Sequence, residues 1–346
     1  MNSPRAPRYT DEQLRLAARL YYVDGLGQAE VAQFTRISQA KVSRLLALAR
    51  ERGIVKISVA EYEPRSLLLE DKLRSLLGLG KVAVIRTLPG ATSGDARRAV
   101  GHFGASIAAS LIAPGNVVAI SGGRTMRELV RNLPTDKKAG LTVVQTMGSI
   151  DSSVAPVDAL ELGRVMARRC DGLFQSLNSP AFVPDKQTRD AFLNLTQIRS
   201  VWQQLNRASV AMVGVGTLEN SIFVERGILS PDELAQLRAG GAVGEICGRF
   251  FNAEGQECDT PWRDRVVSIE LEQLRTIPQV IGIVAGSDRS RAIAAAVRGG
   301  LLKSLIIDEG GANALPFPSF AGGHSAAPAF SNPKSRSGSV TPAALS

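Results

Sequence analysis

Apolar residues at helical spacing predict a short helix that follows Ser38. Four of them recur at intervals of three and four positions: Val42, Leu45, Leu46 and Ala49. This spacing places them on one face, which is expected to be buried. The Ser38 hydroxyl can cap the N-terminus by accepting a backbone N–H, and Gly53 is expected to end the helix. The exposed face carries small and polar side chains, which suit the major groove of DNA.

Further elements surround this helix. Residues 28–34 predict a preceding short helix, joined to it by the turn 35–37, and residues 11–22 predict a supporting helix. Residues 54–59 alternate between apolar and polar side chains, which predicts a strand of the kind called a wing. Residues 1–60 are therefore predicted to form a winged helix-turn-helix DNA-binding domain. A module that uses the same helices to bind a protein remains an alternative.

The pattern changes after a predicted hinge at residues 61–64. The leucine-rich helix predicted over 65–79 could pack within its own domain or associate with a second copy, and the second use is slightly favoured. Short β-branched runs then predict strands at 82–86, 117–121, 142–146, 173–177, 210–214, 266–269, 280–285 and 304–307. Helices are predicted between them at 95–112, 125–133, 156–169, 185–193, 196–207, 231–239 and 289–298.

This alternation predicts an α/β domain over residues 61–315. Apolar strands separated by crossover helices are typical of a parallel sheet covered on both faces. Residues 316–346 are rich in Pro, Ser, Gly and Ala and are predicted to form a disordered tail.

Positive charge is concentrated near the N-terminus. The 346-residue chain has a net charge of +9, and its first 60 residues hold ten Lys or Arg against five Asp or Glu. More than half of the excess therefore lies in the predicted DNA-binding domain. Such a concentration is typical of a module that contacts phosphates, although a solvated basic face would give the same count.

Cysteine and histidine are too few for metal or triad chemistry. Cys170, Cys247 and Cys258 lack the spacing of a zinc site and are odd in number, which fits a reducing compartment. His102 and His324 are the only histidines, which argues against a His-based metal site or a Ser-His-Asp triad. No apolar run is long enough to span a bilayer. We therefore expect a cytoplasmic protein without a cofactor or metal.

Glycine-bearing turns follow several predicted strands. In an open α/β sheet such turns meet at the carboxyl edge, where ligands bind. The turn at residues 121–125 precedes a helix, so its backbone N–H groups and Arg124 could hold a phosphate. Similar turns lie at residues 147–149, 214–217, 244–250 and 285–289. Together they predict a pocket for a phosphate and a polyol.

Several sequence blocks point to a known family. They are YYVDGLGQAEVA, ISQAKVSRLLALARERGIVKI, ISGGRT, VVQTMGS, residues 179–216, GAVGEICGRFFNAEG and residues 264–309. These blocks occur in this order over residues 11–315, and over this range the chain resembles the SorC-type sugar-binding transcriptional regulators. The resemblance implies a winged helix-turn-helix joined to a Rossmann-like effector domain of the sugar-phosphate isomerase type without isomerase activity. It also implies a homodimer or homotetramer that binds double-stranded operator DNA under the control of a phosphorylated sugar.

The resemblance also suggests which residues bind. The DNA-binding candidates are Arg36, Ser38, Gln39, Lys41, Ser43 and Arg44. The effector-binding candidates are Ser121, Gly122, Gly123, Arg124 and Thr125 as the phosphate loop, Gly148 and Ser149 as a second glycine loop, Glu245 for sugar hydroxyls, and Arg289 for the phosphate.

Four positions depart from the family pattern. Gly122 replaces a frequent Trp, residues 177–180 replace a common Leu-Pro-Ala-Pro, and Arg289 replaces a Lys. Gln39 replaces a common Arg and is better suited to adenine than to guanine or phosphate. The sugar and the operator sequence therefore stay open.

A sugar-phosphate isomerase with an added N-terminal domain is the competing hypothesis. Its candidate acids and bases are Glu245, Asp259, Asp288 and Lys303. No local spacing pairs them for proton transfer. The sequence therefore predicts a regulator rather than an enzyme.

Overall fold

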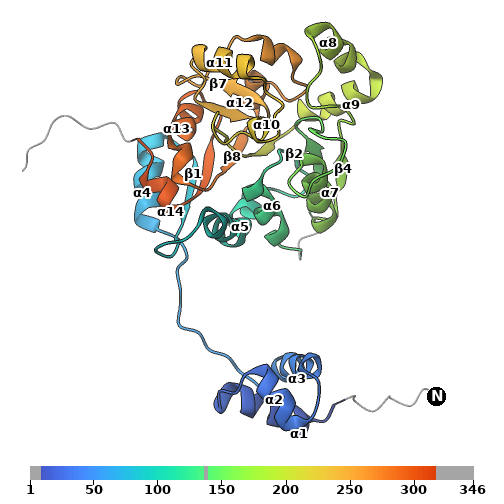
Figure 1. Cartoon of the computed structure of the whole chain (residues 1–346), viewed down its shortest axis with the longest axis vertical. Coiled ribbons are helices and arrows are strands. Elements are labelled where there is room, and N and C mark those ends of the chain that lie inside the picture. Colours follow the sequence, from blue (N-terminus) through green and yellow to red (C-terminus); the bar gives the residue numbers. More distant parts are fainter. Residues whose placement is uncertain (1–8, 136–138, 317–346) are drawn as a thin grey trace, which may run out of the picture. The chain divides into compact units, whose positions relative to one another are not determined.

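The computed structural model describes residues 9–135 and 139–316. The chain divides between Glu63 and Pro64 into two compact units (Figure 1). We call them unit 1 and unit 2 and describe each by itself. The predicted tail lies outside the described residues from position 317 on.

Unit 1 is built from three helices. They are α1 (Asp11–Ala18), continued by the π-helical turn η1 (Arg19–Val23), α2 (Gln28–Thr35) and α3 (Gln39–Glu51). The apolar stripe of α3 packs against Leu14, Ala17 and Val31, as its spacing predicts. Ser38 caps α3, because its Oγ accepts a hydrogen bond from the Lys41 N–H at 3.4 Å.

The predicted wing strand is wrong. Residues 54–59 have no regular secondary structure, and Ile57 and Val59 are 58% and 80% exposed. A strand needs a neighbour that supplies hydrogen-bond partners to its backbone. Among the described residues no segment pairs with this one, so the alternation of side chains alone does not produce a strand.

Unit 2 is an α/β domain. Its helices are α4 (Leu67–Leu77), α5 (Ser93–Ser110), α6 (Arg124–Asn132), α7 (Ala159–Arg169), α8 (Lys186–Asn194), α9 (Thr196–Leu205), α10 (Ile222–Glu225), α11 (Pro231–Ala239), α12 (Leu271–Thr276), α13 (Ser290–Arg298) and α14 (Glu309–Asn313), with 3₁₀ turns η2 (Pro261–Arg265) and η3 (Ser287–Arg289). Its strands are β1 (Lys81–Ile85), β2 (Val117–Ile120), β3 (Thr142–Gln145), β4 (Leu173–Gln175), β5 (Val210–Val213), β6 (Gly244–Ile246), β7 (Arg249–Phe251), β8 (Gln279–Ile283) and β9 (Ser304–Asp308).

Seven of these strands form one parallel sheet, in the order β1-β9-β8-β5-β2-β3-β4. The chain runs outward from β2 through β3 to β4, then returns to place β5 on the other side of β2. The point between β2 and β5 is therefore a topological switch point, where an open α/β sheet leaves a crevice at its carboxyl edge. The predicted parallel sheet is confirmed.

Two apolar cores cover the two faces of this sheet. Helices α5, α6 and α7 pack over one face around Val118, Ile120 and Leu129. Helices α4, α9, α12 and α13 pack over the other around Leu73, Val213 and Ile293. No helix among the described residues is long and apolar enough to cross a membrane.

A third apolar cluster forms what we call the Trp262 lobe, made of α10, α11, β6, β7 and η2. Trp262 packs against Phe223 and Phe250, and its Nε1 donates to the Gly248 carbonyl at 2.8 Å. The sequence predicted a glycine turn over residues 244–250, where the structure has the antiparallel hairpin β6–β7. The predicted strand 266–269 is wrong, since Val266 and Ser268 make only isolated bridges to Phe182 and Met147.

The first residues of unit 2 are anchored on the edge strand β1. Arg65 forms an antiparallel bridge with Ile85, and its guanidinium makes two hydrogen bonds to the buried carboxylate of Glu70, one of them 2.8 Å long. Glu70 also accepts the Val84 N–H at 3.0 Å. Leu69, Leu73 and Leu77 of α4 pack into the core of unit 2, whereas Leu67 and Leu68 are exposed. Self-association through this helix stays a prediction.

Candidate functional site

A cavity of about 370 Å³ lies at the switch point of the sheet. Its wall is built from the ends of β2, β3, β5 and β8, the start of α6, and the Trp262 lobe. All nine residues predicted to bind an effector line it: Ser121, Gly122, Gly123, Arg124, Thr125, Gly148, Ser149, Glu245 and Arg289. Turns that are up to 168 positions apart along the chain therefore meet at one place; whether they bind a ligand there stays a prediction.

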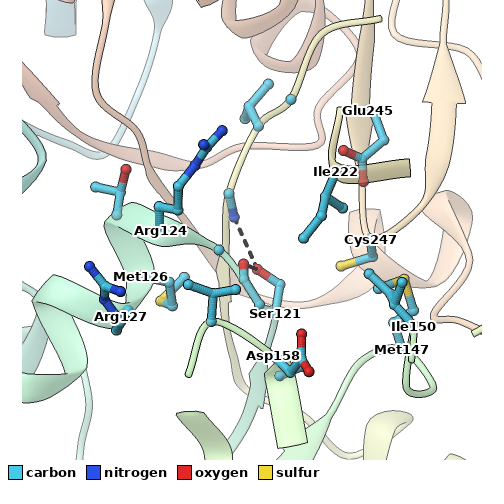
Figure 2. Close-up of a pocket in the computed structure, with 18 of the residues that line it drawn as sticks. Ser121, Arg124, Met126, Arg127, Met147, Ile150, Asp158, Ile222, Glu245 and Cys247 are labelled. Carbon is cyan, nitrogen blue, oxygen red and sulfur yellow. Dashed lines mark hydrogen bonds between the residues drawn. The ribbon is translucent and has the colours of Figure 1, made fainter. Parts of the chain in front are cut away.

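The turn after β2 is held in place from both sides. Ser121 Oγ accepts a hydrogen bond from the Gly214 N–H at 3.1 Å, which joins the turns after β2 and β5 (Figure 2). The Gly123 N–H donates to the Val157 carbonyl at 2.8 Å. A Cβ on Gly122 would lie 2.8 Å from that carbonyl oxygen. The small residue at position 122 is therefore required by the backbone beside it.

The N-terminus of α6 opens onto the cavity. No side chain caps this helix, whose N-cap residue is Gly123 with a φ of 136°. The first N–H groups of an uncapped helix lack partners within the helix and favour an anion. Arg124, the first residue of α6, is paired with Glu225 at 3.1 Å across the cavity mouth.

A second arginine reaches this end of the cavity from a helix that was predicted from the sequence but not expected to line the site. Arg97 lies on α5 and lines the cavity. Burial and the positive charges of Arg124, Arg289 and Arg127 lower its pKa. Sequence reasoning missed Arg97 because α5 precedes β2 and reaches the switch point only through the fold.

The second glycine loop is shaped by packing. A Cβ on Gly148 would lie 2.2 Å from the Pro180 carbonyl oxygen. The Gly148 N–H donates to Val267 O at 3.0 Å and the Ser149 N–H donates to Ser179 O at 2.9 Å. Both N–H groups are thus used inside the protein, which leaves the Ser149 side chain as the polar group this loop offers.

The opposite wall of the cavity is acidic and apolar. Figure 2 shows Glu245, Cys247, Ile222 and Ile150 across the cavity from Arg124 and Arg127. The half-buried Glu245 accepts the Gly248 N–H at 2.5 Å. Burial raises its pKa to about 7, although this N–H and the charge of Arg289 act in the other direction. Burial likewise raises the pKa of the Cys247 thiol to about 12, so this thiol stays protonated.

The candidate acids and bases of an isomerase do not meet. Glu245 lines the cavity, but Asp259 pairs with Arg263 on the surface at 3.1 Å. Lys303 Nζ donates to the carbonyl of Arg275 at 2.8 Å and to that of Ile277. Asp288 is paired with Arg289 at 2.8 Å. No group of three or more His, Cys, Asp or Glu in the described part of the chain could hold a metal ion.

In unit 1, the residues predicted to bind DNA are exposed and close together along the chain. Arg36, Ser38, Gln39, Lys41, Ser43 and Arg44 are all exposed, in the turn before α3 and on its first turns. Arg36 has a left-handed backbone (φ 54°) and ends α2. Their role in binding stays a prediction.

Comparison with known proteins extends these observations. Residues 64–315 match the profile of the family described as "Putative sugar-binding domain". The chain is 29% identical to the deoxyribonucleoside regulator of Bacillus subtilis, over 86% of this chain and 95% of that protein. It is 28% identical to the sorbitol operon regulator of Klebsiella pneumoniae, over 84% of this chain and 92% of that protein.

A solved structure covers both units. The crystal structure of the full-length sorbitol operon regulator SorC from Klebsiella pneumoniae covers 88% of this chain and 99% of its own, with a TM-score of 0.67 at 26% identity. These relatives are named as regulators, and other relatives of similar identity are named as transcriptional regulators, so the isomerase alternative is set aside. The chain belongs to the SorC-type family of sugar-binding transcriptional regulators.

Proposed function

We propose that unit 2 binds a phosphorylated sugar in the cavity at the switch point, and that occupancy changes how unit 1 holds its operator. The observation that carries this proposal is the meeting of the uncapped N-terminus of α6 with Arg124, Arg97 and Arg289 at one end of the cavity. A phosphate there would receive backbone N–H groups and guanidinium groups together. Glu245 at the other end would accept hydrogen bonds from sugar hydroxyls.

Unit 1 is proposed to bind double-stranded DNA through α3. Gln39, Ser43 and Arg44 would contact base edges, and Lys41 and Arg36 would contact phosphates. All five are exposed, while the apolar stripe on the other face of α3 is buried. A palindromic operator bound by a homodimer or homotetramer is part of this proposal, because two-fold symmetry doubles the contact with DNA. We also propose that the protein is located in the cytoplasm, where the operator would lie.

Linkage connects the two sites. An effector can change the affinity for DNA only by binding more tightly to one of two arrangements of the protein. The free energy that the effector adds to one arrangement sets the largest change in operator affinity it can produce.

A thermal-shift panel tests the effector site. We expect at least one sugar phosphate to raise the melting temperature of the full chain, since a ligand that binds only the folded state stabilises it. Arg124→Ala should abolish the shift, whereas Arg164→Ala, at an exposed position of α7 outside the cavity, should keep it. A wild-type protein that no sugar phosphate of a broad panel stabilises would contradict the proposal.

A further inference from the structure

The arginines that line the cavity differ in whether a carboxylate pairs with them, and this difference affects which ligand can bind. Most of its arginines have a carboxylate partner: Arg124 has Glu225, Arg127 has Glu128, Arg226 has Asp151 and Asp158, and Arg289 has Asp288. Among the described residues no hydrogen bond or ion pair engages Arg97. Arg97 is therefore the cation of the lining that is free to meet a ligand.

Arg97 sits among like charges. The positive charges of Arg124, Arg289 and Arg127 act on its guanidinium and, together with burial, lower its pKa. The Glu128 carboxylate offsets part of this repulsion, but it is hydrogen-bonded to Arg127. A phosphate placed among these groups and at the start of α6 would remove the repulsion.

The far end of the cavity offers a second phosphate no unpaired guanidinium among the described residues. Met147, Ile150, Ile222, Cys247 and Glu245 lie at this end (Figure 2). Two lining arginines bear on this wall: Arg289, whose charge acts on Glu245, is paired with Asp288, and Arg226 is held by Asp151 and Asp158. A second phosphate would have to break that arrangement or approach a carboxylate, which is unfavourable in either case.

We infer that the cavity takes a ligand with one phosphate, that Arg97 is the residue on α5 that holds this phosphate, and that the Glu245 end excludes bisphosphates. The inference rests on the proposed function, because it concerns the same cavity. It assigns the two ends of the ligand: phosphate toward Arg97 and α6, and an uncharged end toward Glu245 and the apolar wall. A hydroxyl at the uncharged end of the ligand would donate a hydrogen bond to Glu245. A carbon without a hydroxyl would contact Ile150 and Ile222.

Calorimetric titration of the full chain tests the selection between ligands. The probes are fructose monophosphate and fructose bisphosphate, ribulose monophosphate and ribulose bisphosphate, and inorganic phosphate. We expect the better monophosphate to bind at least about 10-fold more tightly than its bisphosphate, since a second doubly charged group would lie near the Glu245 carboxylate. Glu245→Gln removes the carboxylate charge and should reduce the ratio between monophosphate affinity and bisphosphate affinity.

Variants of α5 test the role of Arg97. Arg97→Ala should weaken the monophosphate and inorganic phosphate by about 10- to 100-fold, which corresponds to loss of charge-assisted hydrogen bonds. Arg97→Lys should restore part of the affinity, because lysine keeps the positive charge but lacks the planar guanidinium that can make two hydrogen bonds to a phosphate. Arg98→Ala is the matched control, since Arg98 is the next residue, is exposed, and pairs with Asp95 outside the cavity.

The outcomes separate the two proposals. If a bisphosphate binds as tightly as its monophosphate, or if Arg97→Ala binds phosphate like the wild type, the inference is overturned while the proposed function stands. If none of the phosphate-bearing probes binds, the proposed function fails and the inference fails with it. If Arg97→Ala does not fold, the comparison of monophosphate and bisphosphate affinities on the wild-type chain still tests the inference.

Discussion

Ser121 and Gly214 are joined across the switch point of the sheet, because Ser121 Oγ accepts the Gly214 N–H at 3.1 Å. Both residues line the cavity, and the hydrogen bond joins the turns that follow β2 and β5. Both turns carry predicted ligand contacts, so the bond fixes their spacing before any ligand arrives.

Ser121→Ala should destabilise unit 2 by about 1–2 kcal/mol, because it leaves the Gly214 N–H without its partner. Chemical denaturation of the full chain measures this effect. Thr125→Ala is the control, because Thr125 lines the same cavity without a hydrogen bond of its side chain to the described residues; we expect it to change stability by less than about 0.5 kcal/mol. Equal effects of the two substitutions would count against a structural role for the Ser121 bond.

Glu245 should make stability depend on pH near neutrality. Its folded-state pKa of about 7 lies above the ordinary value of 4.5, so the folded protein holds this proton more tightly than the unfolded chain. The resulting stabilisation is full below pH 4.5 and is lost as the pH rises through about 7. A shift of this size corresponds to at most about 3 kcal/mol.

Glu245→Gln isolates this contribution, because Gln cannot ionise. Melting curves between pH 5 and 8 should show the stability of the variant, relative to the wild type, rising with pH. Asp259→Asn, at an exposed position of the same lobe, should follow the wild-type profile. A constant difference between Glu245→Gln and the wild type across this range would contradict the prediction.

Arg44→Ala should weaken binding to the operator by at least about 10-fold, since one lost contact to a base edge corresponds to about 1–3 kcal/mol. Operator fragments selected in vitro with the full chain provide the probe, and gel shifts at fixed salt provide the measurement. Arg74→Ala removes an exposed arginine from α4 and should bind DNA like the wild type. Unchanged affinity of Arg44→Ala would remove Arg44 from the reading surface.

Glu70→Ala should destabilise unit 2 by about 2–3 kcal/mol, because it leaves the Arg65 guanidinium and the Val84 N–H without the carboxylate that they share. Asp71→Ala is a control at the adjacent position, where an exposed pair with Arg74 is worth less than about 1 kcal/mol. Urea denaturation of both variants compares them. A Glu70→Ala protein as stable as Asp71→Ala would show that the anchor contributes nothing.

The sequence could predict what depends on local periodicity and on order along the chain. Parallel strands end at a common edge, so the turns at Ser121, Gly148 and Arg289 could be placed together before the structure was known. The buried stripe of α3 and the cap at Ser38 followed from spacing in the same way.

What the sequence could not predict depends on neighbours distant along the chain. The alternation at residues 54–59 predicts a strand only if another segment supplies hydrogen bonds, and none of the described residues does. The hairpin β6–β7 was hidden because its glycines also fit a ligand loop. Arg97 carries no local signal, since its importance arises from three arginines contributed by other segments.

The anchor at Arg65 places the first residues of unit 2 on the edge of the sheet that also bears the cavity. Arg65 bridges Ile85, the last residue of β1, and Ile85 is in register with Asp308 at the end of β9. Asp308 Oδ1 accepts the Gly286 N–H at 2.7 Å, at the start of the loop that carries Arg289. The cavity and the first residues of unit 2 thus share one edge of the sheet, so we expect substitutions along this edge to alter the response of DNA binding to the effector.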